Sequence, residues 1–154
     1  MSEWNELLRI VAPCDSLYLR EIGEPKRNTL RLVLAEGKVS SQVESLEFGG
    51  SRIENVRGVK VTADSLVIEL TWQQYIAYAV MNESFSQPEG SEFDDSVRLL
   101  RRYSDSSFLA HISRATIATE EYPGHFEHVQ VVSETHIVDV VATELPSYRV
   151  LSRA

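Results

Sequence analysis

The chain has 154 residues, the usual length of one globular domain, and we expect a single domain spanning residues 1–154. Its content of 43% hydrophobic and 25% charged residues is typical of a protein that folds around an apolar core. The formal net charge of -8 at pH 7 argues against a nucleic-acid-binding protein, because that binding depends on lysine and arginine neutralising phosphates.

The N-terminal segment is predicted to be a short helix and not a signal peptide. Its apolar residues have the i, i+3, i+4, i+7 spacing of one helical face: Trp4, Leu7, Leu8 and Val11. Ser2 can cap this helix, and Pro13 ends it. The segment has acids where a signal peptide is basic, and no apolar run reaches the roughly 20 residues of a membrane span. With Cys14 as the single cysteine, these features predict a cytoplasmic protein.

A first β-hairpin is predicted from two runs with alternating leucines, residues 16–22 and 29–36. The segment 38–57 that follows has no clear periodicity. We predict that it is mainly loop, with a short edge strand around Leu46 and Phe48.

The longest apolar run of the chain, residues 66–85, follows a second predicted turn. We expect Val59 and Val61 to pair with the start of this run across a turn at residues 62–65. The first part of the run alternates strictly, as a half-buried strand does: Leu66, Ile68, Leu70 and Trp72. Residues 74–82 are apolar on both sides and fit a buried strand or a buried helix. We predict a strand, because the surroundings are rich in β-forming residues.

A polar loop follows this run. Between residues 82 and 95 it carries acids and no base: Glu83, Glu89, Glu92, Asp94 and Asp95. Loops carry function more often than strands, and an acidic surface attracts basic proteins. We therefore predict that these acids bind a protein partner with a basic surface. The alternatives are a solvated loop and intramolecular pairing with Arg98, Arg101 and Arg102.

The second helix is predicted at about residues 104–116, where an apolar stripe follows a capping serine or aspartate. We expect Phe108 and Ile112 of this helix to pack on the sheet face that contains Ile68 and Leu70.

The C-terminal region predicts a last hairpin from the β-rich runs 125–133 and 136–143, with a possible edge strand at residues 148–151. The chain as a whole therefore predicts an α+β fold. Its main element is an antiparallel sheet built from sequential hairpins, covered by the helix at about 104–116 and by the short N-terminal helix.

The histidines are the only candidates for metal binding or acid–base chemistry. His125 and His128 are three residues apart, and His136 and Asp139 follow at the same spacing. In a strand, residues i and i+3 point to opposite faces, so we predict no metal site. A cross-strand contact between His128 and His136 stays open. No nucleophile motif or phosphate-binding glycine motif is present, and no catalytic residue or cofactor is predicted.

Three classes of function remain. The first is an interaction protein, such as an inhibitor or immunity-type partner of a basic protein. The second is a small-molecule binder or enzyme with a pocket lined by aromatic and histidine side chains: Trp72, Tyr75, Tyr78, His128 and His136. The third is a homodimeric structural subunit. Neither a nucleic acid nor a membrane is a predicted partner. A concave apolar cavity would favour the second class over the first.

Overall fold

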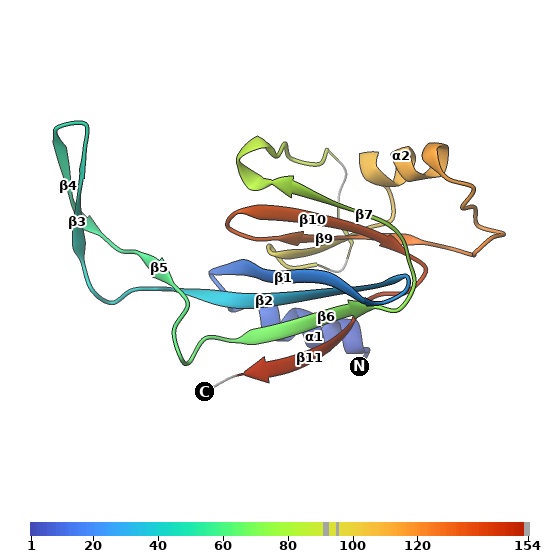
Figure 1. Ribbon diagram of the computed structural model, residues 1–154, viewed down its shortest axis with the longest axis horizontal. Helices are drawn as coiled ribbons and strands as arrows, with labels where there is room; N and C mark the ends of the chain where they lie inside the picture. The colour runs from blue at the N-terminus through green and yellow to red at the C-terminus, as the bar shows by residue number, and fades with distance from the viewer. Residues whose placement is uncertain (91–92, 95, 153–154) are drawn as a thin grey trace.

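The computed structural model describes residues 1–90, 93–94 and 96–152. It is an α+β fold of mostly antiparallel sheet, as the sequence predicts. Its described helices are α1, Glu3–Val11, α2, Ser107–Ala115, and the short 3-10 helix η1, Glu83–Phe85. The strands form three sheets and not the single sheet expected from the sequence (Figure 1).

The first sheet has the strand order β1-β2-β6-β11, with β5 paired to the end of β2. Its strands are β1, Ser16–Lys26, β2, Thr29–Val39, β5, Val59–Lys60, β6, Val67–Trp72, and β11, Ser147–Ser152. The first hairpin and the C-terminal edge strand are therefore confirmed. The predicted pairing of Val59 with the start of β6 is wrong, because β2 continues to Val39 and Val59 pairs there.

The second sheet has the order β7-β10-β9-β8. Its strands are β7, Tyr75–Asn82, β8, Leu100–Tyr103, β9, Glu127–Val132, and β10, His136–Ala142. Residues 75–82 are thus a strand, and the last hairpin is formed by β9 and β10. From Ile137 to Ala142 every residue of β10 is buried, so this central strand is covered on both faces.

One apolar core joins the inner faces of the two sheets with α1. Its residues include Leu30, Leu32, Leu34, Ile68, Leu70 and Trp72 of the first sheet, Val129, Val131, Val138 and Val140 of the second, and Trp4, Leu7, Leu8 and Val11 of α1. The periods of two residues in the strands and of about 3.6 residues in the helix are the patterns seen in the sequence. Ser2 caps α1 by accepting a hydrogen bond from the Asn5 N–H at 3.2 Å.

Helix α2 lies on the outer face of the second sheet (Figure 1). Leu109 and Ile112 are buried there against Val141, with Phe108 packed beside them. The prediction that α2 covers the sheet face containing Ile68 is therefore wrong. Residues of β10 with odd numbers, such as Val141, point away from the shared core and give α2 an apolar surface of its own.

A hairpin of strands β3, Glu44–Phe48, and β4, Ser51–Val56, projects from the body of the molecule (Figure 1). The sequence predicted mainly loop over residues 38–57, with a short edge strand around Leu46 and Phe48. The prediction of loop is wrong for most of this segment, because β3 and β4 occupy it. The strands are joined by Gly49 and Gly50, with φ of 56° and 81°. Tight two-residue hairpin turns need positive φ at their central positions, which glycine adopts without strain.

A charged cluster on the first sheet predicts how stability depends on pH. Arg31 Nε lies 2.6 Å from Glu69 Oε2, and Arg149 Nη2 lies 3.2 Å from Glu69 Oε1. The hydrogen bond from Arg31 lowers the pKa of Glu69. A carboxyl group with a lowered folded-state pKa stabilises the fold above its unfolded pKa, and this stabilisation disappears as the pH falls through the folded pKa.

We therefore expect Glu69→Gln to lower the free energy of unfolding at about pH 7 and to have a smaller effect at about pH 3, because the stabilisation by the carboxylate begins to disappear below the unfolded-state pKa. Urea unfolding at the two pH values measures the difference. Glu47→Gln, in the projecting hairpin, is the control. An equal loss at both pH values for Glu69→Gln would exclude the charge of Glu69 as the cause.

Candidate functional site

The described acids of the predicted partner-binding loop have different surroundings, although Glu83 and Glu89 line one shallow groove with Arg101. Glu83 is exposed in η1, and Asp94 is exposed beside the end of β8, where its N–H donates to the Arg102 carbonyl. The Ser104 hydroxyl donates to Asp94 Oδ1 at 3.4 Å. Glu92 and Asp95 lie outside the described residues.

Glu89 has an intramolecular partner that the sequence analysis did not anticipate. Its carboxylate accepts hydrogen bonds from the Ser107 hydroxyl at 2.7 Å and from the Ser107 N–H at 3.3 Å. Ser107 begins α2, and a negative charge is stabilising at a helix N-terminus. Glu89 therefore ties the acidic loop to α2.

The arginines that follow the loop have several kinds of partner among the described residues. Arg98 donates to the Asp15 carbonyl, and Arg101 lies over the Phe93 ring, 5.5 Å from its centroid. Arg102 Nε lies 2.7 Å from Glu127 Oε2. Within the described residues, neither Arg98 nor Arg101 forms an ion pair with an acid of the loop.

Of the five residues of the predicted aromatic and histidine pocket, Tyr75 and Tyr78 are in contact and pack against the core that contains Trp72. Trp72 is 1% exposed in the shared core. Tyr75 and Tyr78 are half-buried on β7, where their rings meet edge to face with centroids 4.9 Å apart. The Tyr75 hydroxyl donates to the Glu24 carboxylate, which raises the pKa of Tyr75 to about 12.

The two histidines of that set are apart from each other. His128 is buried on the outer face of the second sheet, and its partner in the ladder is Val141. His136 pairs with Asn82, at the other end of β10. The suggested contact of His128 with His136 is therefore wrong: β9 ends at Val132, so His136 lies beyond the β9–β10 ladder.

His128 belongs to a buried polar chain that crosses from α2 to β10. Its Nε2 lies 2.6 Å from Asp139 Oδ1, and its Nδ1 lies 2.8 Å from Ser106 Oγ. An ionised Asp139 only accepts, so it assigns the hydrogen of a neutral His128 to Nε2. The Ser106 hydroxyl then donates to Nδ1. Asp139 also accepts from the Gln130 amide at 2.9 Å.

The order serine, histidine, aspartate resembles the hydrogen-bonded relay of serine hydrolases. Here the serine is not available to a substrate. Ser106 is 2% exposed, and its oxygen also accepts from the Leu109 N–H at 3.1 Å as the N-cap of α2. The chain Ser106–His128–Asp139 therefore holds the start of α2 on the second sheet. The sequence contains one sign of this chain. His128, Gln130 and Asp139 alternate along their strands with the core valines, so they lie on the opposite face of the sheet.

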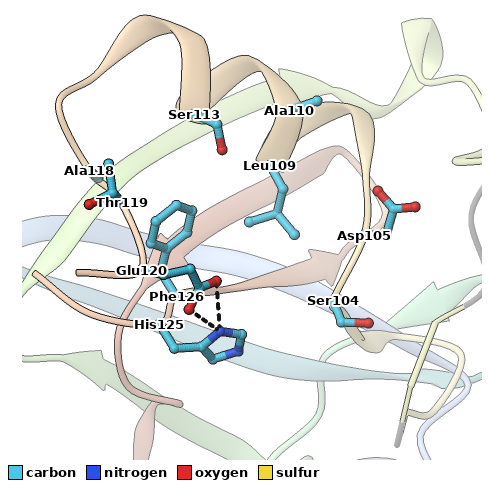
Figure 2. Close-up of a pocket in the computed structure, with 10 residues that line it drawn as sticks. All are labelled: Ser104, Asp105, Leu109, Ala110, Ser113, Ala118, Thr119, Glu120, His125 and Phe126. Carbon is cyan, nitrogen blue, oxygen red and sulfur yellow. Dashed lines mark hydrogen bonds and ion pairs between the residues drawn. The ribbon is translucent and has the colours of Figure 1, made fainter. Parts of the chain in front are cut away.

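A groove lies beside this buried chain, between α2 and residues 117–126 (Figure 2). It has a volume of about 410 Å³. The residues that line it are Ser104, Asp105, Leu109, Ala110, Ser113, Ala118, Thr119, Glu120, His125 and Phe126. His125 Nδ1 lies 3.1 Å from each carboxylate oxygen of Glu120. From the sequence, His125 was a candidate for metal binding or acid–base chemistry, and its pairing with Glu120 was not predicted.

A second exposed feature is the apolar side of the β3–β4 hairpin. Leu46 pairs with Ile53, and Phe48 pairs with Ser51. Leu46, Phe48 and Ile53 therefore share one face, on which they are 52%, 83% and 54% exposed. We name these three residues the hairpin face. Exposed apolar surfaces of this kind mark interaction sites.

Comparison of the chain with protein-family models, with curated proteins and with solved structures gave no match. Within residues 1–90, 93–94 and 96–152, no three histidine, cysteine or acidic side chains gather as metal ligands. In the same part of the chain, no helix has the length and apolar character needed to cross a membrane.

Proposed function

We propose that this chain is a small cytoplasmic interaction protein that binds a basic protein partner, as inhibitors and immunity-type proteins do. The observation that carries the proposal is the hairpin face. Leu46, Phe48 and Ile53 extend from the body on a two-stranded sheet whose apolar side is open to solvent. A large aromatic side chain in such a place, Phe48, is typical of residues that dominate binding energy.

The β3–β4 hairpin gains little stabilisation from contacts with the rest of the fold. All but one of its strand residues are exposed. A single two-stranded hairpin is only marginally stable in water. Burial of apolar surface by a partner, at roughly 25 cal/mol per Å², would stabilise both the complex and the hairpin.

Charge argues that this partner is basic. The whole chain has a formal net charge of -8. The hairpin itself carries Glu44, Glu47 and Glu54 against the single base Arg52. A second copy of the chain brings the same sign of charge to the interface, whereas a basic protein is attracted and finds the site faster.

The acidic loop has a supporting part in this proposal. Glu83 and Asp94 are exposed, and Glu92 and Asp95 are in the same segment of sequence. We propose that they add to the attractive field at long range. Glu89 contributes less to binding, because its carboxylate is already paired with Ser107.

The test is capture of a partner with a single substitution that leaves the fold intact. Phe48 is 83% exposed, so Phe48→Ala should not change the melting temperature. We expect it to weaken partner binding by about tenfold or more, the loss typical of a central aromatic contact. Ile117→Ala is the matched control, because Ile117 is 85% exposed elsewhere on the molecule.

The measurement is capture from an extract of the source cells by wild type, Phe48→Ala and Ile117→Ala, followed by surface plasmon resonance with the captured protein. The proposal requires a basic protein, bound by wild type and Ile117→Ala, with an association rate that falls as salt rises. Equal capture by all three proteins would contradict it. A concentration-dependent dimer of the pure wild type, lost in Phe48→Ala, would instead support a homodimeric subunit.

A further inference from the structure

We propose that the groove between α2 and residues 117–126 is a second, separate binding site, and that it takes a small organic cation: an ammonium group on an apolar body. The site is distinct from the hairpin face, because α2 and the hairpin lie at opposite ends of the molecule (Figure 1). The proposal therefore does not depend on the protein partner.

The inner part of the groove is apolar. Leu109 projects from α2, and the Phe126 ring faces it from the opposite wall (Figure 2). Ala118 adds a small buried surface on the wall formed by residues 117–126. These side chains offer a hydrophobic contact and the face of one aromatic ring. Ligand sites commonly combine such an apolar lining with a few polar groups that fix orientation.

The rim of the groove is negative. Asp105 precedes α2, and Glu120 lies on the opposite wall (Figure 2). Among the described residues that line the groove there is no lysine or arginine. Within the described part of the chain the Asp105 carboxylate has no hydrogen bond or ion pair. Two carboxylates on facing walls favour a cation and oppose an anion.

His125 adds orientation to the rim. A neutral His125 donates its Nδ1–H to Glu120, at 3.1 Å, which holds that carboxylate at the mouth of the groove. The wall formed by α2 is fixed as well, because Ser106 at its start is bonded to His128. The volume of about 410 Å³ is within the range of small-molecule sites, roughly 300–1,000 Å³. The groove is therefore shaped and charged for a small amine.

The test uses phenethylamine, which has an aromatic body and an ammonium group, and its neutral analogue phenethyl alcohol. Each is titrated to about 1 mM or above into isotopically labelled protein, and amide chemical shifts are followed by NMR. We expect saturable shifts for the amine in α2 and residues 117–126. The alcohol should bind about tenfold more weakly, because it lacks the charge.

Variants locate the site. Asp105→Asn and Glu120→Gln should each weaken amine binding several-fold, whereas Glu121→Gln should not, because Glu121 is an exposed neighbour that does not line the groove. Equal binding of amine and alcohol, no saturable shift, or equal effects of Glu120→Gln and Glu121→Gln would each overturn the proposal. Binding of an arginine-containing peptide without binding of the amine would also overturn it, and would assign the groove to a protein side chain.

Discussion

Asp139→Ala is expected to lower the free energy of unfolding by about 2–6 kcal/mol, because it leaves two donors without an acceptor at about 1–3 kcal/mol each. Asp139 is 8% exposed, and His128 beside it is 1% exposed. Without the carboxylate, the His128 Nε2–H and the Gln130 amide lose their acceptor. A buried donor without an acceptor retains the full penalty of having left water.

Urea unfolding of Asp139→Ala, His128→Ala and the double variant measures this coupling. The two single changes should be far from additive, because each removes the same interaction. Asp94→Ala, at an exposed acid, should change stability by less than about 0.5 kcal/mol. Additive effects at His128 and Asp139 would show that the buried chain does not act as a unit.

Ser106 provides a separate check on the interpretation of this chain as structural. A fluorophosphonate probe should not label the folded protein, because the Ser106 hydroxyl is buried and already bonded at both His128 and Leu109. Mass spectrometry of the treated protein reports the result. Stoichiometric labelling at Ser106, abolished in His128→Ala, would identify a nucleophile and contradict the structural role.

Trp72→Ala is the second change with a large expected effect, about 3–5 kcal/mol of lost stability. Trp72 is 1% exposed and lies opposite Leu30 in the ladder of β2 and β6. Its removal leaves a cavity in the core shared by both sheets and α1. The sequence analysis left open a role for Trp72 in a ligand pocket, and the two roles predict different results.

Thermal melting and amine titration of Trp72→Ala separate these roles. If Trp72 is a core residue, Trp72→Ala should lower the melting temperature by many degrees. Phenethylamine should still bind the folded fraction with unchanged affinity. Trp72→Phe should lose less stability than Trp72→Ala, because phenylalanine keeps most of the side-chain volume. Phe85→Ala, at a 78% exposed ring outside the groove, is the neutral control. Lost amine binding with an unchanged melt would place Trp72 in a binding site.

Local patterns predicted the elements that depend on neighbouring residues. The spacing of Trp4, Leu7 and Leu8 with a serine before them fixes α1, and alternating leucines fix β1 and β2. The β9–β10 hairpin follows from short-range turn and strand preferences. The β3–β4 hairpin was missed, although Gly49 and Gly50 are a strong turn signal, because its strands lack a buried face and so show no sharp hydrophobic alternation.

By itself, the sequence determined the α+β class, most strands, both α-helices and the acidic character of the chain. Tertiary structure alone decided the division into separate sheets, the placement of α2 against Val141, and the meeting of Ser106, His128 and Asp139. Those contacts join residues far apart in the chain, and hydrophobic periodicity reports that a face is buried without reporting what covers it. The groove around Glu120 and His125 has the same origin, because its two walls meet only when α2 docks on the second sheet.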